Sequence, residues 1–167
     1  MFRIVSYILP DELLKESIAY AENALKNNDN ISIRHDFDKT GTVLMHRLSD
    51  DHILFDKLKQ QISTSTVIDP TMIGFNYMLA GSTLYWHKDK YPMLGSVTIY
   101  LNKIWQKDWG GSLMYTDKED IPDKVEALFP QLNVGVIQTE GKTLHHVTPT
   151  SKDAPIRMTI QMFQHTP

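Results

Sequence analysis

Trp86-His87-Lys88-Asp89 places a histidine and a carboxylate two positions apart, and Leu144-His145-His146-Val147 adds a histidine pair much later in the chain. The residues around both segments favour β-strands. Because side chains two apart on a strand point to the same face, His87 and Asp89 can converge on one ion. His145 would complete a facial triad of two histidines and one carboxylate, which leaves other metal positions open. The rest of the chain must then form a cup around that ion.

Arg157 lies in a later β-like segment, where Thr159, Gln161 and Phe163 share its face. An arginine that points into a barrel is costly unless it meets an anion. Its planar fork binds a carboxylate through two hydrogen bonds, so it could anchor a dicarboxylate co-substrate. The open positions of an iron(II) ion could hold such a co-substrate together with dioxygen. These residues predict a mononuclear non-haem iron oxygenase.

The bulk composition excludes several other classes of protein. The 167 residues favour one domain, and 41% hydrophobic with 22% charged residues is ordinary for a globular protein. A net charge of -3 gives no reason to expect a nucleic-acid partner. The absence of cysteine excludes disulfides, thiolate metal sites and iron–sulfur clusters. Residues 1–14 contain no apolar run long enough for a signal peptide or membrane span, so we expect no membrane partner and a cytoplasmic location.

The first part of the chain predicts two helices and a hairpin. Residues 2–9 form a first strand, and a helix follows from Asp11 because its apolar residues recur at helical spacing until the Asn/Asp cluster at 27–30. Residues 50–62 predict a second helix. Between them, the runs 31–37 and 42–48 predict a hairpin around a turn at 39–41. Its polar residues are expected on a solvated face; they are Arg34, His35, His46 and Arg47.

From residue 73 onward the sequence predicts mostly strands. They are expected at residues 73–79, 83–89, 96–101, 111–115, 133–138, 143–148 and 155–163, with an acidic excursion containing a helical turn at 117–129. Strands and helices do not alternate, so the pattern favours a closed or sandwiched β core flanked by helices, a mainly β chain of the α+β class. We expect one domain over residues 1–167, with support from residues 1–72 and the core in residues 73–163.

The order of the motifs resembles the 2-oxoglutarate- and iron(II)-dependent dioxygenases, and most of all their prolyl-hydroxylase-like branch. The segments that carry the resemblance are Tyr77-Met-Leu-Ala-Gly81, His87-Lys-Asp89, Thr98-Ile-Tyr-Leu-Asn102, Trp109-Gly-Gly-Ser-Leu113, His145-His-Val-Thr-Pro149 and Arg157. Together they span residues 73–163, and their shared order is far more specific than any single motif. The resemblance implies a double-stranded β-helix (jelly-roll) core.

The resemblance also implies roles for individual residues. Iron(II) would be held by His87, Asp89 and His145. Arg157 would bind the distal carboxylate of 2-oxoglutarate with the help of Tyr100, and Tyr77 would lie near the iron-chelating end of that co-substrate. Two departures from the family pattern stand out: the interval from His145 to Arg157 is longer than expected, and His146 stands where an arginine is frequent. His146 is therefore a second candidate for the distal iron ligand.

The implied reaction is hydroxylation of an aliphatic carbon, with iron(II), 2-oxoglutarate and dioxygen as cofactor and co-substrates. An intact Asp89 favours hydroxylation over halogenation, because halide replaces the carboxylate in the family's halogenases. The expected substrate is an amino-acid-like group, most of all a prolyl or other residue in a protein or peptide; a free amino acid or small metabolite is the alternative. Loops at a barrel mouth usually read substrate, so residues 30–47 and the loops of Tyr91 and Trp105 are candidate contacts.

Three other classes of protein could also use a barrel of this kind. A zinc hydrolase can employ two histidines and a carboxylate, but Arg157 and Tyr100 would then have no role. A cupin-type isomerase or binding protein normally adds a further ligand near the first one. A non-catalytic metal-binding barrel would be expected to lose a ligand, and none is missing here.

Overall fold

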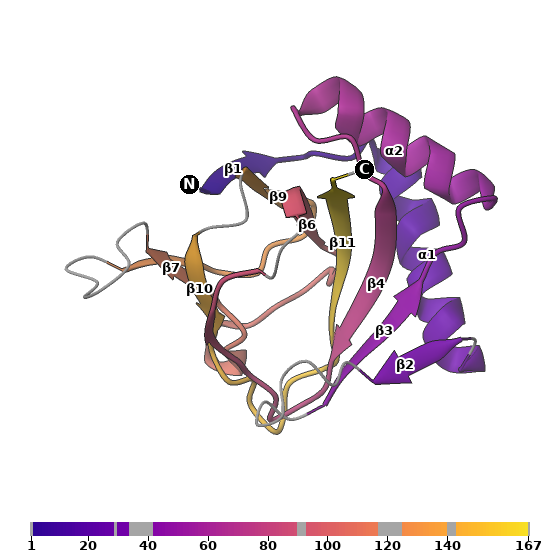
Figure 1. Ribbon diagram of the computed structural model, residues 1–167. Helices are drawn as coiled ribbons and strands as arrows, with labels where there is room; N and C mark the ends of the chain where they lie inside the picture. Colours follow the sequence, from indigo (N-terminus) through magenta and orange to yellow (C-terminus); the bar gives the residue numbers. More distant parts are fainter. Residues whose placement is uncertain are drawn as a thin grey trace.

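The computed structural model describes residues 2–28, 30–33, 42–89, 93–116, 125–139 and 143–166. Its strands form two antiparallel sheets (Figure 1). The larger sheet contains, in spatial order, β1 (Phe2–Ser6), β9 (Val134–Thr139), β6 (Met93–Tyr100), β11 (Arg157–His165), β4 (Met72–Met78), β3 (Val43–Arg47) and β2 (Ile31–Ile33). The smaller sheet contains β5 (Leu84–His87), β10 (Leu144–Val147), β7 (Leu113–Thr116) and β8 (Glu126–Leu128).

The strands of the C-terminal part alternate between the two sheets, except that β8 follows β7 in the smaller sheet. β4, β6, β9 and β11 belong to the larger sheet, whereas β5, β7 and β10 belong to the smaller one. Figure 1 shows the smaller sheet facing the larger one on the side away from the helices. This winding of one chain through two facing sheets is the expected double-stranded β-helix, so the predicted fold class is confirmed.

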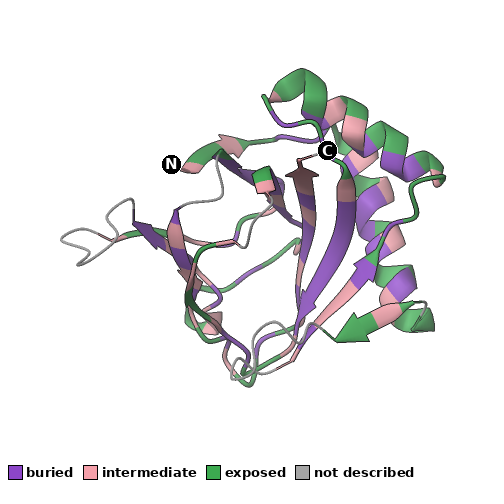
Figure 2. Cartoon of the chain, viewed as in Figure 1, coloured by how far each residue is buried: buried purple, intermediate pink, exposed green. Residues whose placement is uncertain are grey.

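Both helices cover the outer face of the larger sheet. α1 (Asp11–Asn27) buries Leu14, Ile18 and Ala21, as its helical spacing predicts. It is capped by Asn28, which adopts the left-handed conformation that such caps use. α2 (Ile53–Ser65) begins three residues later than predicted, because the His52 side chain caps it by accepting a hydrogen bond from the Leu54 amide at 3.1 Å. Figure 2 shows the buried face of each helix turned toward the strands. Neither helix has the length and apolar character of a membrane crossing.

Strand alternation divides the interior into two regions. On β11, Ile160 and Met162 face the helices and join the main core, whereas Arg157 and Thr159 face the smaller sheet. The main core contains many fully buried apolar side chains, each of which stabilises the fold by about 1.5–3 kcal/mol. A smaller apolar cluster lies between the sheets, where Val136 is one of its members. Both apolar and polar side chains therefore line the space between the sheets.

The N-terminal strand is attached to the larger sheet through Asn133. β1 ends at Ser6, and the next residue, Tyr7, has a φ of 56° that turns the chain away from the sheet edge. The Asn133 side chain then accepts a hydrogen bond from the Leu9 amide at 2.9 Å and donates one to the Leu9 carbonyl at 2.7 Å. This connection holds β1 against β9 and brings Phe2 to the space between the sheets.

Some predictions for the hairpin and the loops need correction, and others concern residues that the structure does not describe. β2 and β3 pair as the expected hairpin, and Arg47 is exposed as expected. His46 is instead buried, because its position on β3 faces the helices, and its ring lies 3.0 Å from the Tyr20 hydroxyl in a hydrogen bond. Residues 126–128 form strand β8 instead of part of a helical excursion. Outside the described residues lie the predicted hairpin turn at 39–41, the strand positions Arg34 and His35, the loop residue Tyr91 and residues 117–124.

Candidate metal and co-substrate site

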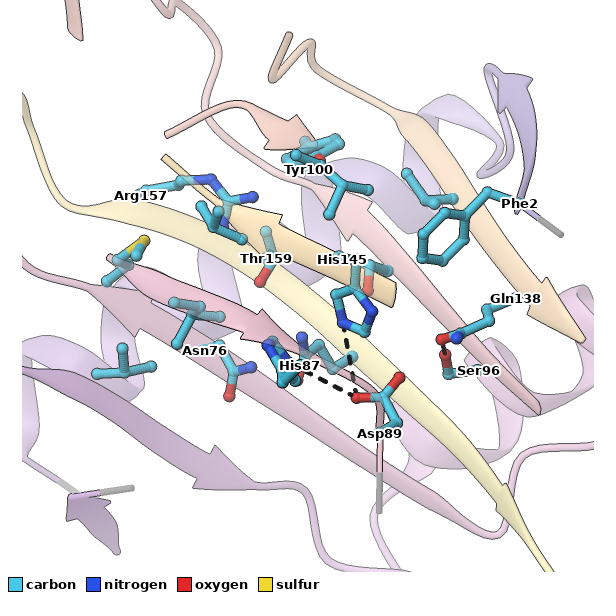
Figure 3. Close-up of a pocket in the computed structure, with 18 of the residues that line it drawn as sticks. Phe2, Asn76, His87, Asp89, Ser96, Tyr100, Gln138, His145, Arg157 and Thr159 are labelled. Carbon is cyan, nitrogen blue, oxygen red and sulfur yellow. Dashed lines mark hydrogen bonds and ion pairs between the residues drawn. The ribbon is translucent and has the colours of Figure 1, made fainter. Parts of the chain in front are cut away.

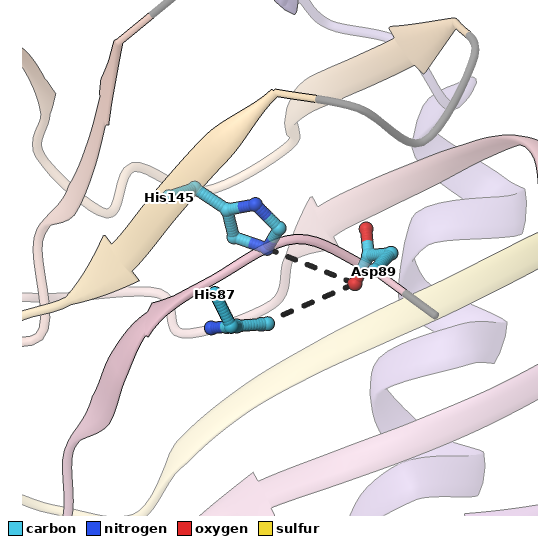
Figure 4. A group of neighbouring side chains, drawn as sticks. All are labelled: His87, Asp89 and His145. Atoms are coloured by element: carbon cyan, nitrogen blue, oxygen red, sulfur yellow. Dashed lines mark ion pairs between the residues drawn. The ribbon is translucent and has the colours of Figure 1, made fainter. Parts of the chain in front are cut away.

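Two paired strands and the residues after one of them bring the predicted metal ligands together. β5 and β10 are antiparallel neighbours, and His145 lies opposite His87, with 4.2 Å between the ring centroids. Asp89 follows the end of β5. Its Oδ1 lies 4.0 Å from His87 Nε2 and 3.8 Å from His145 Nε2 (Figure 4). One ligand atom from each of the three residues lies within 4.8 Å of the other two, a spacing that one divalent ion could bridge.

The backbone fixes which nitrogen of each imidazole faces the aspartate. His87 Nδ1 donates to the Tyr85 carbonyl at 2.6 Å, and His145 Nδ1 donates to the Thr143 carbonyl at 2.9 Å. Both Nε2 atoms therefore point toward Asp89. Histidines that bind metals are commonly held in this way, with the second nitrogen bonded to a carbonyl or carboxylate. The donor set of two imidazoles and one carboxylate fits iron(II) and leaves one side of the ion open.

His146 takes no part in this cluster. It is the next residue on β10, so its side chain points to the opposite face of the strand. Its ring stacks on Trp86 at a centroid distance of 5.4 Å, and its Nδ1 lies 2.6 Å from the Leu84 carbonyl. Of the two histidines that the sequence leaves as candidates for the distal ligand, the structure thus brings only His145 to His87 and Asp89.

Arg157 lies in the same cavity as the three ligands, at the start of β11. The side chain is buried, with 6% of its surface exposed, and its guanidinium carbon lies 4.9 Å from the centroid of the Tyr100 ring. Burial lowers the pKa of the Arg157 guanidinium and raises the pKa of the Tyr100 hydroxyl. Within the described part of the chain no carboxylate pairs with Arg157, and its Nε has no hydrogen-bond partner. A buried cation of this kind calls for an anionic ligand.

The glycine turn before β7 shapes the wall beside Arg157. Gly110 and Gly111 both have positive φ, as glycine allows. A Cβ atom on Gly111 would lie 3.0 Å from Arg157 Cδ, so the absence of a side chain makes room for the arginine stem. Trp105 is buried behind this turn and donates to the Gly110 carbonyl at 2.8 Å. Trp105 therefore supports the wall; it does not line the cavity as a substrate contact.

The cavity also contains polar residues that the sequence analysis did not single out. Figure 3 shows the ligands, Arg157 and Tyr100 around one space between the sheets. Within the described chain, three buried polar side-chain atoms lack any hydrogen-bond partner: Arg157 Nε, Asn76 Oδ1 and Gln138 Nε2. All three residues line this cavity. Buried polar groups are normally paired, so this concentration marks the cavity as a place where a ligand completes the bonding.

Tyr77 does not lie where the resemblance implies. It is fully buried on the helix side of β4 and donates to the Ala21 carbonyl of α1 at 2.8 Å. Its neighbours Asn76 and Met78 line the cavity instead. A shift of one residue along a strand moves a side chain to the other face. The structure therefore corrects this expectation: Tyr77 joins a helix to the sheet, and we leave it out of the co-substrate site.

Sequence comparison identifies the family to which this architecture corresponds. The 2OG-Fe(II) oxygenase superfamily matches residues 73–165, which is more than half of the chain and includes all three candidate ligands and Arg157. No curated protein sequence matches the chain significantly.

Solved structures with the same fold include several prolyl hydroxylases. A Pseudomonas putida prolyl-4-hydroxylase has a TM-score of 0.75 at 16% identity, with 99% of this chain and 93% of that chain covered. A Trichoplax adhaerens prolyl hydroxylase, in complex with a peptide fragment of the hypoxia inducible factor oxygen degradation domain, has a TM-score of 0.79 at 16% identity, with 98% and 83% covered. The viral collagen prolyl hydroxylase of Paramecium Bursaria Chlorella virus-1 has a TM-score of 0.68 at 13% identity, with 97% and 94% covered.

Proposed function

The chain belongs to the 2OG-Fe(II) oxygenase superfamily, and from this premise we propose that it hydroxylates an aliphatic carbon of a prolyl or other residue in a protein or peptide. Enzymes of this family are dioxygenases that use iron(II), 2-oxoglutarate and dioxygen. We assign His87, Asp89 and His145 to iron(II), and Arg157 with Tyr100 to the distal carboxylate of 2-oxoglutarate.

The buried guanidinium of Arg157 is the observation that carries this proposal. It lies in one cavity with the three candidate ligands. Among the residues that the structure describes, no carboxylate forms an ion pair with it. A zinc hydrolase of the same donor set would have no use for a buried cation in this place. A short diacid satisfies both ends of the cavity, since its distal carboxylate meets Arg157 while its keto-acid end reaches the metal ligands.

The side chains of this enzyme bind and orient the reactants. The Nε2 atoms of His87 and His145, together with the Asp89 carboxylate, would hold the ion on one side. The Tyr100 hydroxyl, kept neutral by its raised pKa, would donate a hydrogen bond to the carboxylate that Arg157 binds. When bound, iron, 2-oxoglutarate and dioxygen would supply the oxidising chemistry: 2-oxoglutarate loses carbon dioxide and takes up one oxygen atom of dioxygen to become succinate, and the other oxygen atom enters the substrate C–H bond as a hydroxyl. Arg157 and Tyr100 are buried, which limits the access of bulk water to the co-substrate end of the cavity.

The proposal that the substrate is a peptide rests on analogy with proteins of the same fold. One of the similar structures holds a peptide fragment, and another is named for collagen. At identities of 13–16% these similarities support the fold, and the substrate must be tested directly.

The test measures succinate formed from 2-oxoglutarate under air, with iron(II) and a panel of proline-containing peptides. Wild type should release succinate only when iron(II) is present, and mass spectrometry should show a gain of one oxygen on the substrate peptide. His87→Ala should abolish both, while His146→Ala serves as the matched control and should keep them. Zinc-supported hydrolysis that needs no keto acid would contradict the proposal, as would succinate release that survives in His87→Ala.

A further inference from the structure

Four side chains form a row across the larger sheet, at the end of the cavity away from Arg157. Phe163 on β11 is paired with Ser96 on β6, Ser96 with Gln138 on β9, and Gln138 with Phe2 on β1. All four line the cavity. Residues directly opposite on neighbouring strands lie side by side on one face. The Phe163–Phe2 row therefore presents two polar groups between two aromatic rings.

Gln138 is the member of the row whose bonding is incomplete. Only 1% of its surface is exposed, and its Oε1 accepts a hydrogen bond from the Ser96 hydroxyl at 3.4 Å. Its Nε2 is buried and has no partner within the described part of the chain. A buried donor without a partner destabilises a protein, so such groups are normally paired or reserved for a ligand. The atom that would satisfy Gln138 is a hydrogen-bond acceptor.

The co-substrate cannot supply that acceptor while Arg157 holds it. Arg157 and Phe163 are the first and last cavity-lining residues of β11, and strand geometry places them about 20 Å apart. 2-Oxoglutarate is a short diacid that spans well under half of this distance. The row lies close to the metal ligands on their other side, because the Phe2 ring packs edge-on against His145 with 5.6 Å between centroids. Figure 3 shows Gln138 and Ser96 beyond His145 and Asp89 as seen from Arg157.

The charges around the row decide which acceptor fits. Among the described residues that line the cavity, Arg157 is the only arginine or lysine, and the proposed function assigns it to 2-oxoglutarate. A substrate carboxylate at the row would lose its hydration without forming an ion pair with a positively charged side chain. A neutral carbonyl needs only the donor that Gln138 offers, and the apolar atoms beside it can pack on the rings of Phe2 and Phe163.

Resting on the proposed function, we propose that the Phe163–Phe2 row is the subsite for the substrate to be oxidised, and that Gln138 Nε2 binds a neutral carbonyl oxygen of that substrate. The subsite selects an amide or ketone with apolar flanks over a free carboxylate. Gln138 is thereby a specificity-determining residue of the hydroxylase.

The test compares two probes that differ only in this group, N-acetyl-L-proline N-methylamide and N-acetyl-L-proline. Both are titrated calorimetrically into the protein loaded with Mn(II) and 2-oxoglutarate. The methylamide should bind wild type about tenfold more tightly than the acid, the value of one hydrogen bond. Gln138→Met keeps the side-chain length but removes the donor. It should weaken methylamide binding about tenfold without lowering the melting temperature, because the amide that it removes is only partly satisfied.

Gln131→Met is the matched control, because Gln131 is exposed just before β9 and does not line the cavity; it should leave binding unchanged. Ser96→Ala, a smaller change, should weaken methylamide binding in the same direction. Three results would each overturn the subsite. The first is that the acid binds as tightly as the methylamide or more tightly, and the second is that Gln138→Met binds the methylamide as well as wild type does. The third is that neither probe binds to protein that takes up 2-oxoglutarate. A lower melting temperature of Gln138→Met would overturn it too, by showing a structural role. Wild type that fails to bind 2-oxoglutarate would instead refute the proposed function.

Discussion

His145 lies directly opposite His87 across the β5–β10 pair, and the backbone carbonyls of Thr143 and Tyr85 hold the two rings in the same tautomer. Both Nε2 atoms consequently face Asp89. The site is thus organised by strand pairing and by local hydrogen bonds. These contacts orient the side chains that we assign to iron(II).

Mn(II), which is redox-stable under air, should stabilise the protein by binding to these ligands. At a metal concentration about 100 times the dissociation constant, the free energy of unfolding should rise by about 2.7 kcal/mol. His145→Ala should lose this increase, whereas His146→Ala should retain it because His146 stacks on Trp86 outside the cluster. Urea unfolding with and without Mn(II) measures both values. An equal response of the two variants would show that the ion binds elsewhere.

Arg157→Gln should separate co-substrate binding from stability. The variant removes the cation that the proposed function assigns to 2-oxoglutarate, so KM for 2-oxoglutarate should rise about 100-fold. This change corresponds to about 2.7 kcal/mol, which lies within the range of about 2–5 kcal/mol for breaking a buried charge pair. In the absence of ligands the same variant should unfold at the same or higher urea concentration, because an uncompensated buried charge has been removed. Arg47→Gln, at an exposed arginine of β3, is the control and should change neither value. A marked loss of stability with unchanged KM would assign Arg157 a structural role.

Much of this site could be predicted from the sequence because its signals are local or periodic. His87 and Asp89 are two residues apart, and Arg157 lies on a strand whose alternation is clear. The resemblance misplaces Tyr77, because the alternation along β4 puts it on the helix side together with Ile73 and Phe75. Gln138 and Ser96 carry no motif at all. They meet only through the pairing of β6 with β9, and no local pattern reveals a pairing between distant strands.

The tyrosine hydroxyl at position 77 should affect alkaline stability and not co-substrate binding. Burial raises the pKa of Tyr77, so the folded protein keeps this proton at a pH where the unfolded chain releases it. The contribution of Tyr77 to stability is therefore complete below the unfolded pKa of about 10 and is lost as the pH rises through the higher folded value. Tyr77→Phe should show a shallower loss of stability above about pH 10.

Urea unfolding between neutral and alkaline pH measures this difference. At neutral pH Tyr77→Phe should cost about 1 kcal/mol, for the hydrogen bond to the Ala21 carbonyl, and should leave KM for 2-oxoglutarate unchanged. Tyr7→Phe is the matched control, since Tyr7 is 85% exposed, and its alkaline profile should follow wild type. An increase of KM in Tyr77→Phe would restore this tyrosine to the co-substrate site.

Asn133 should prove essential for the position of the N-terminal strand. Its side chain bonds to both backbone groups of Leu9, and its φ of 58° lies in the left-handed region, which asparagine tolerates better than alanine does. Asn133→Ala leaves two buried backbone groups unpaired and adds backbone strain, so the free energy of unfolding should fall by about 2–4 kcal/mol. Asn133→Gly removes the same hydrogen bonds but relieves the strain, and it should be the milder variant by about 1 kcal/mol.

The two variants together distinguish the hydrogen bonds from the backbone conformation, and hydrogen exchange of the β1 amides locates the effect. Because β1 carries Phe2 to the cavity beside His145, both variants should increase exchange along Phe2–Ser6 more than along β4. Equal stability of the alanine and glycine variants would show that the left-handed conformation of Asn133 contributes nothing. Unchanged exchange in β1 would show that the strand is held by its pairing with β9 alone.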